Sequence, residues 1–167
     1  MLIKTLDIVV APDPILKKKA NKVKKVDKKI QKLMNQMLET MYGAPGIGLA
    51  APQVGVSKQI IVIDVSENKD NPLFLINPVI TNASEDTCIR EEGCLSAPDQ
   101  FGDVERPCEI TVEYLDYYGE PQKFTTDGLL ATCIQHEIDH LKGIMFYEHL
   151  STLRKHMMIK KLKKMKK

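Results

Sequence analysis

Two stretches of the chain have the hydrophobic pattern of helices. In residues 27–42 the apolar positions recur every three or four residues, which predicts an amphipathic helix that Gly43 ends. Residues 127–142 are apolar around most of the helical circumference, which predicts a helix that is buried on nearly all sides. Asp127 or Thr126 can cap the start of this helix, and Gly143 suits the left-handed position after its end. The methionine-rich stripe of the first helix is expected to be core.

Shorter apolar and alternating runs lie between these helices. Residues 60–65 form a short apolar run typical of a buried strand, and residues 73–76 predict a second strand. Residues 109–115 alternate polar and apolar positions, as a half-exposed strand does, and residues 118–121 form a turn into a strand near residues 123–125. The pattern predicts an α+β fold, with mixed or antiparallel sheets packed around the buried helix and helices at both ends.

Length and composition favour one compact unit. A chain of 167 residues with 43% hydrophobic content can bury a core as a single domain, residues 1–167, and we see no internal repeat or linker. No apolar run reaches the roughly 18 residues that a membrane span needs. The first ten residues lack a secretory apolar core and cleavage site, so we expect a cytoplasmic protein. We also expect it to be a monomer.

The four cysteines show no CxxC spacing. Without a signal peptide, reduced thiols are the expected state. Cys88, Cys108 and Cys133 are therefore interpreted as structural or neutral residues, with Cys133 packing in the core as part of the buried helix.

The buried helix carries an HExxH motif, formed by His136, Glu137 and His140. Histidines four positions apart on a helix point the same way, so both imidazoles can reach one divalent cation. Glu137 lies between them and can hold a water that the metal activates. The alternative interpretation is an ordinary helix with two surface histidines that bind no metal. It is disfavoured because two histidines and two acids on a buried helix need partners, and a metal supplies one.

The third ligand distinguishes the possible enzymes. No acid follows Glu148, which argues against the downstream glutamate of thermolysin-like peptidases, and Phe146 stands where an extended HExxHxxGxxH motif has its third histidine. Glu148 and His149 remain candidates, although they follow the helix closely on the outgoing chain. Among the cysteines, Cys94 is framed by the glycine-containing segment 92–96.

Residues 46–53 are a second glycine-rich segment, which alone would be a tight turn. Dinucleotide binding is disfavoured because Ala51 replaces the third glycine of GxGxxG and a predicted helix precedes the motif. Together with residues 92–96 and 135–140, this segment resembles the bacterial type I peptide deformylases, whose motifs are GxGLAAPQ, EGCLS and QHExDH. The resemblance covers nearly the whole chain.

This resemblance implies one metal ion per chain, held by Cys94, His136 and His140. A thiolate and two imidazoles suit zinc on ligand preference. The family implies Fe²⁺ as the physiological ion, with Zn²⁺, Ni²⁺ or Co²⁺ able to substitute.

The same resemblance implies the reaction and its catalytic groups. Glu137 would act as general base and proton shuttle, while the Gln53 side chain and the Leu95 backbone N–H would meet the oxyanion. The substrates would be N-formylmethionyl nascent peptides, from which formate is released. A tight carbonyl pocket would exclude an acetyl group. The substrate-binding positions implied are Gly46, Ile47, Gly48, Leu129 and Cys133.

Four positions depart from the family pattern, and all are near the substrate. Ala97 is small where a branched residue is common, and Phe101 stands where many relatives carry arginine. Arg90 and Thr132 replace positions that are often aliphatic. These changes bear on pocket shape and not on the reaction.

Two other function classes each explain part of the pattern. A small zinc metallopeptidase with Cys94 or His149 as third ligand would leave Gln53 and Leu95 without a role. A non-enzymatic zinc module that binds nucleic acid through its lysines would need a fourth protein ligand, which no cysteine pair supplies, and would leave Glu137 unused.

The last stretch, residues 151–167, carries eight basic residues and no acid, so the first 150 residues have a net charge of −6 within a total of +2. Ser151 can cap a helix there, which we treat as a basic appendage. A solvated terminal helix is the plain alternative, and a membrane-surface helix would lack its usual aromatic anchors. Because basic C-terminal helices dock related deformylases on ribosomes, we expect this tail to bind the ribosome, with no DNA or membrane partner.

Overall fold

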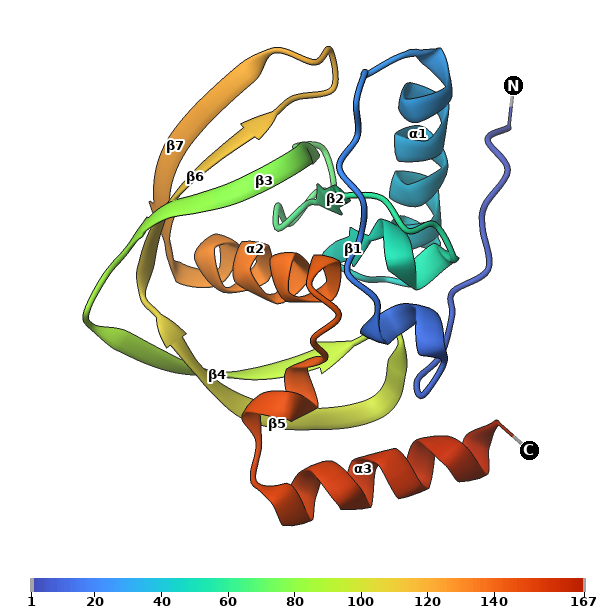
Figure 1. The fold of residues 1–167 in the computed structure, drawn as a ribbon, viewed down its shortest axis with the longest axis vertical. Coiled ribbons are helices and arrows are strands. Elements are labelled where there is room, and N and C mark those ends of the chain that lie inside the picture. Colours follow the sequence, from blue (N-terminus) through green and yellow to red (C-terminus); the bar gives the residue numbers. More distant parts are fainter. Residues whose placement is uncertain (1, 167) are drawn as a thin grey trace.

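The computed structural model describes residues 2–166, in which two antiparallel sheets enclose a central helix (Figure 1). The larger sheet has the strand order β1-β2-β3-β6-β7, and every neighbouring pair is antiparallel. Its strands are β1 Gly48–Ala50, β2 Ile60–Ile63, β3 Leu73–Ala83, β6 Glu109–Leu115 and β7 Pro121–Asp127. The smaller sheet is a hairpin of β4 Thr87–Cys94 and β5 Ala97–Pro107. The predicted α+β class is confirmed.

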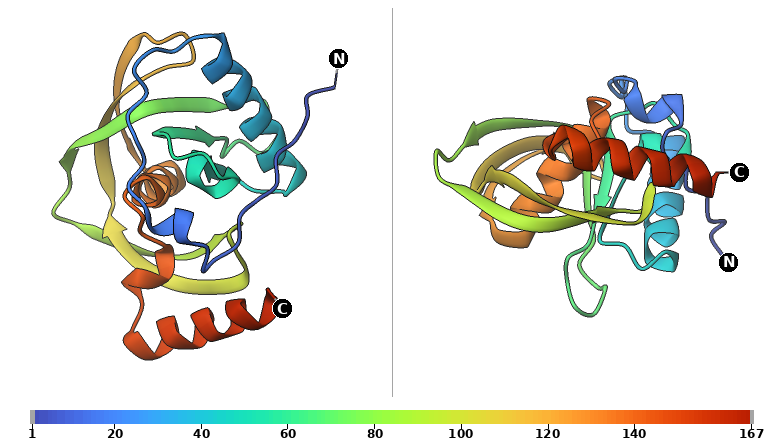
Figure 2. Two further views of the ribbon diagram at one scale, coloured as in Figure 1. Left: turned by 45° about the vertical axis from the view of Figure 1, so that its right-hand side comes forward. Right: turned by 90° about the horizontal axis from the view of Figure 1, so that it is seen from below.

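Three α-helices and three short 3₁₀ helices complete the part of the chain that the structure describes (Figures 1 and 2). The α-helices are α1 Lys28–Gly43, α2 Gly128–Leu141 and α3 Thr152–Met165, and the 3₁₀ helices are η1 Pro14–Lys17, η2 Ala51–Val54 and η3 Phe146–His149. Helix α2 lies between the larger sheet and the β4–β5 hairpin, as Figure 1 shows. None of the helices in the described part of the chain has the length and apolar character that a membrane crossing requires.

The predicted first helix agrees with α1 to within a residue at each end. The Asp27 carboxylate accepts a hydrogen bond from the backbone N–H of Ile30 at 3.0 Å, which caps the helix start. Met34, Met37 and Met41 are fully buried and pack against β1 and β2. The methionine stripe is therefore core, as expected.

Helix α2 also matches its prediction, and it contributes Ala131, Cys133, Ile134, Ile138 and Leu141 to the central core. Its apolar side chains pack against the inner face of the larger sheet. Asp127 occupies the N-cap position, but its side chain makes no capping hydrogen bond. Gly143 has a φ of +79° after the helix end, and a Cβ there would lie 2.3 Å from the carbonyl oxygen of Lys17. Both the backbone conformation and this close approach favour glycine.

The predicted strands are present, with differences in length, and β7 also begins earlier than predicted, at Pro121. Strand β2 ends at Ile63, whereas β3 extends well beyond the predicted residue 76. Asn77 interrupts β3 with a φ of +51° at a shift in register against β6. Its side-chain amide bonds the backbone N–H and C=O of Val23 at 2.9 and 2.8 Å, so an asparagine stabilises the irregularity.

The β4–β5 hairpin was not predicted. On β5 the buried positions alternate regularly with exposed ones, but several buried ones are not apolar: Gln100, Gly102 and Arg106. Because polar and glycine residues occupy the inward face, the apolar period of two is absent from the sequence.

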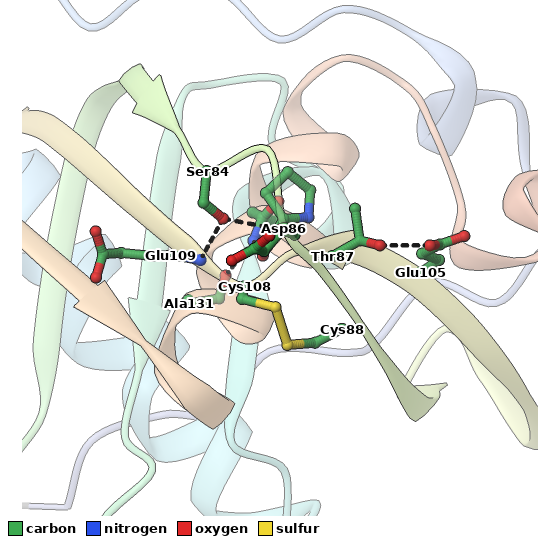
Figure 3. Close-up of a disulfide and its surroundings, with 10 residues drawn as sticks. Ser84, Asp86, Thr87, Cys88, Glu105, Cys108, Glu109 and Ala131 are labelled. Carbon is green, nitrogen blue, oxygen red and sulfur yellow. Dashed lines mark hydrogen bonds between the residues drawn. A yellow bond between two sulfur atoms is a disulfide. The ribbon is translucent and has the colours of Figure 1, made fainter.

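Cys88 and Cys108 form a disulfide in the structure, with a sulfur–sulfur distance of 2.03 Å (Figure 3). The expectation that all four cysteines are reduced is wrong for this pair, while Cys94 and Cys133 are free thiols. The bridge joins the start of β4 to the residue between β5 and β6 because the hairpin places these positions side by side. Sequence spacing of 20 residues carried no sign of that pairing.

Helix α3 runs along β5 at the edge of the molecule (Figures 1 and 2). The Ser151 hydroxyl accepts a hydrogen bond from the backbone N–H of Arg154 at 3.3 Å, which confirms the predicted cap. Met158 and Leu162 are buried against η3 and the hairpin. The basic helix is thus packed on the body of the protein through an apolar stripe.

Candidate metal centre and substrate cleft

The central helix and the β4–β5 hairpin bring three metal-ligand side chains together. His136 and His140 lie one turn apart on α2, with ring centroids 5.0 Å apart, and Cys94 ends β4. One ligand atom from each of the three lies within 4.8 Å of the others, and the Cys94 sulfur is 3.3 Å from Nε2 of His140. The donor set of one sulfur and two imidazoles suits a first-row transition-metal ion.

The other candidates for the third ligand lie outside this group. His149 Nε2 is 2.8 Å from a carboxylate oxygen of Asp139, and Glu148 forms an exposed ion pair with Lys155 at 2.6 Å. Only Cys94 among the candidates considered therefore reaches the two histidines.

A buried ion-pair network orients the ring of His136 through its Nδ1 atom. Glu92 Oε1 is 2.9 Å from Nδ1 of His136, which leaves Nε2 as the nitrogen available to a metal. Arg106 donates to both Glu92 oxygens, at 2.7 and 2.9 Å, and to Asp139 at 2.8 Å. Burial alone would raise the pKa of Glu92, but the bonds from Arg106 and His136 outweigh it and lower that pKa to about 2. Glu92 is therefore an anion that fixes the ring of His136.

This network was missed in the sequence. Glu92 stands out in the sequence only as the first residue of the 92–96 motif, and no local pattern connects it with Arg106 or Asp139. The two acids on the buried helix did predict a need for partners, but Asp139 finds Arg106 and His149 in place of a metal. Because the network joins β4, β5 and α2, its members are far apart in the chain. The one available signal was the buried-helix position of Asp139.

Glu137 is buried at 3% exposure beside the ligand group. Its Oε1 atom has no hydrogen-bond partner among the protein atoms of residues 2–166, and burial raises its pKa to about 7. A Cβ at Gly48 would lie 2.6 Å from the other Glu137 oxygen and 2.8 Å from the Cys133 sulfur. Glycine at position 48 therefore allows β1 to approach this carboxylate closely, and a buried unpartnered carboxyl oxygen indicates a polar ligand at the site.

Gln53 approaches the group from η2. Its side-chain oxygen Oε1 accepts a hydrogen bond from the backbone N–H of Ala50 at 2.9 Å, which fixes the orientation of the side-chain amide. Its Nε2 atom then lies 3.1 Å from the Ser96 hydroxyl and 3.4 Å from the Cys94 sulfur. Leu95 directly follows Cys94, and both Gln53 and Leu95 line the same cavity.

That cavity is a cleft of about 490 Å³ in front of the ligand group. All five predicted substrate-binding positions line it: Gly46, Ile47, Gly48, Leu129 and Cys133. So do the four positions that depart from the family pattern: Arg90, Ala97, Phe101 and Thr132. Ile47 and Leu129 are exposed apolar side chains, at 43% and 47%, on its wall. The cleft thus combines apolar walls with a few polar groups at one end, as small-ligand sites do.

Comparisons with known proteins agree with this arrangement. The model of the polypeptide deformylase family matches residues 5–156. The chain is 54% identical over 161 residues to the peptide deformylase of Pelagibacter ubique, covering 95% of this chain and 94% of the relative. It is 55% identical over 159 residues to that of Nitrosococcus oceani, with 95% of each covered.

Solved structures are similar to the same extent. A peptide deformylase from Ehrlichia chaffeensis in complex with actinonin has a TM-score of 0.95 at 42% identity, covering 98% of this chain and 99% of that one. A peptide deformylase from Legionella pneumophila has a TM-score of 0.92 at 43% identity, covering 97% and 95%. The family model spans most of the chain, and each relative named here is matched over nearly its full length. The chain belongs to the polypeptide deformylase family.

Proposed function

We propose that this chain is a metal-dependent peptide deformylase that removes the formyl group from the N-terminal formyl-methionine of newly synthesised polypeptides and releases formate. The observation that carries the proposal is the grouping of Cys94, His136 and His140 at one end of a cleft, with the carboxylate of Glu137 beside them. Family membership supports the same reaction.

Cys94, His136 and His140 would hold the metal, and three protein ligands leave a position for water. When bound, a divalent cation lowers the pKa of such a water and polarises a carbonyl oxygen. We propose Fe²⁺ as the physiological ion, with Zn²⁺, Ni²⁺ or Co²⁺ able to take the same three ligands.

Glu137 is proposed to move the protons. It accepts a proton from water as the water oxygen forms a bond to the formyl carbon, and it returns a proton to the nitrogen when the carbon–nitrogen bond breaks. A pKa raised by burial suits a group that must both accept and donate. The products are formate and a free N-terminal amine.

Gln53 and Leu95 are proposed to stabilise the negative oxygen that forms on the formyl carbon. The Gln53 amide is already oriented by its bond from Ala50, so its N–H groups need not reorganise during the reaction. The Leu95 backbone N–H would be the second donor. The space around Gly46 and Gly48 would fit the small formyl hydrogen and exclude the methyl of an acetyl group.

The methionine side chain is proposed to occupy the apolar part of the cleft. Ile47, Leu129 and Cys133 line that region, and the exposed apolar side chains there would become buried by a substrate. Arg90 and Thr132 make one wall more polar than an aliphatic pocket would be.

The deciding assay compares formyl-methionyl, acetyl-methionyl and unmodified peptides of one sequence. Release of formate from the first alone is expected. Cleavage of an internal peptide bond would identify a metallopeptidase instead, and tight metal binding without turnover of any peptide would favour a structural metal module.

We further propose that α3 binds the ribosome through its lysines, which would raise the local enzyme concentration where nascent chains emerge. Removal of α3 is a poor test, because Met158 and Leu162 are buried. Substitution of the exposed Lys160, Lys163 and Lys164 by Ala should weaken co-sedimentation with ribosomes in a salt-dependent way. The matched control is the substitution of the exposed Lys17, Lys18 and Lys19 by Ala. Equal effects of both variants would contradict a specific role of α3.

A further inference from the structure

A second cavity, of about 390 Å³, lies between β5 and α3, and we call it the distal cavity. It is lined by Asp99, Gln100, Phe101, Arg154, Met157, Met158 and Lys161. Asp99, Gln100 and Phe101 also line the substrate cleft. The two cavities therefore share a wall, and α3 forms the far side of the distal one.

Phe101 lines both cavities and belongs to the wall that they share. Its side chain is 55% exposed although it belongs to a strand, and it lies over Gly93, where a Cβ would be 2.6 Å from the ring. Its carbonyl oxygen accepts a hydrogen bond from the Arg154 guanidinium at 3.2 Å, which ties α3 to this part of β5. The exposed ring can therefore make apolar contacts with a ligand that extends from one cavity into the other.

The distal cavity is lined by more basic than acidic side chains. Arg154 and Lys161 are both exposed on its α3 wall, against one acid, Asp99, on its β5 wall. Met157 is 51% exposed between them. These α3 residues recur at three- and four-residue spacing, so they share one helix face, whereas Lys163 does not line the cavity.

We infer that the distal cavity continues the substrate cleft and binds the downstream part of a formylated polypeptide, with a preference for acidic side chains. The inference rests on the proposed function, because the substrate itself is the occupant. A polypeptide held by its first residues must leave the cleft, and the shared wall at Phe101 leads to α3. Arg154 and Lys161 would then attract acidic residues, while Phe101 and Met157 would contact the chain's apolar groups.

The test is a kinetic comparison of one tripeptide and two octapeptides. All begin with the same formyl-methionyl tripeptide, and the octapeptides carry either Glu or Lys at their last four positions. Because an exposed charge pair contributes up to about 1 kcal/mol, which corresponds to about five-fold, we expect wild-type kcat/KM to be about two- to five-fold higher for the acidic octapeptide. The difference should be in KM and should decrease with added salt.

Lys161→Glu should abolish or reverse that preference, so that the Lys octapeptide becomes the better substrate. Lys163→Glu is the matched control, since it makes the same charge change on the same helix outside the cavity, and it should keep the preference. Tripeptide turnover should be the same in all three proteins.

Equal kcat/KM for both octapeptides in the wild type would overturn the inference. So would equal effects of Lys161→Glu and Lys163→Glu, which would indicate general electrostatic attraction by α3. Failure of the wild type to deformylate even the tripeptide would instead contradict the proposed function, and the inference with it.

Discussion

Glu92 and His136, which are 44 residues apart in the chain, lie in direct contact, with Oε1 2.9 Å from Nδ1. Arg106 holds the same carboxylate through two further hydrogen bonds. A carboxylate behind a ligand histidine fixes the ring orientation and raises its basicity. Glu92 is therefore a positioning residue for the proposed metal site.

Substitution of Glu92 by Gln should weaken metal binding by about 10- to 100-fold, because the amide keeps the shape but loses the anion. Titration with a competing chelator measures this affinity. Glu91→Gln, at the neighbouring exposed position, should have little effect. Unchanged affinity in Glu92→Gln would remove Glu92 from the metal site's supporting network.

Substitution of Glu137 by Ala should retain the metal and reduce kcat by about 10²- to 10⁴-fold, since the proposed proton shuttle is lost while the three ligands remain. Metal analysis beside turnover tests this prediction. Loss of the metal together with activity would assign Glu137 to the ligand set.

Cys94→Ser should strongly weaken metal binding, because a serine hydroxyl is a far poorer ligand than a thiolate. The Cys88→Ser/Cys108→Ser double variant, which leaves the site cysteine in place, is the control and should bind metal normally. An Fe²⁺-loaded wild type should also lose activity in peroxide through oxidation of metal or sulfur. A fully active, metal-loaded Cys94→Ser enzyme would refute this ligand set.

Reduction of the Cys88–Cys108 disulfide should lower the free energy of unfolding by about 3 kcal/mol, because the bridge closes a loop with a sequence separation of 20. Denaturant unfolding with and without reductant measures the difference. The Cys88→Ser/Cys108→Ser variant should be insensitive to reductant. Identical unfolding of the wild type in both conditions would mean that the bridge contributes nothing in solution.

Asp64 should contribute stability that depends on pH. Burial opposes its charge, but hydrogen bonds from Ser66, Tyr42 and the backbone of Asn71 prevail and lower its pKa below the usual value of an aspartate. The contribution is therefore complete above the unfolded-state value and is lost as pH falls through the folded-state pKa.

Asp64→Asn should accordingly destabilise the protein by about 1–3 kcal/mol at pH 7, with a smaller difference from wild type below about pH 4. Denaturant unfolding across that pH range measures it, and Asp103→Asn, at an exposed position, is the control. A difference independent of pH would show that the Asp64 charge is not the cause.

The sequence by itself determined the elements with strong periodicity. Helices α1 and α2 and strands β2 and β6 were predictable because each carries a continuous local pattern of apolar positions. The grouping of His136 and His140 was equally local, because helical geometry alone puts residues four apart on one face. The position of Cys94 beside them was predicted from motif and resemblance, and the tertiary structure brings it there.

Only the tertiary structure decided the hairpin, the disulfide, the Glu92–Arg106 network and the distal cavity. Strand β5 buries Arg106 where an apolar residue would be expected, because Arg106 is neutralised by Glu92 and Asp139 from two other elements. Cys88 and Cys108 become neighbours only through that hairpin. Such features depend on pairs that are distant in the chain, and a local pattern of hydrophobic positions carries no information about which distant partner satisfies a buried charge.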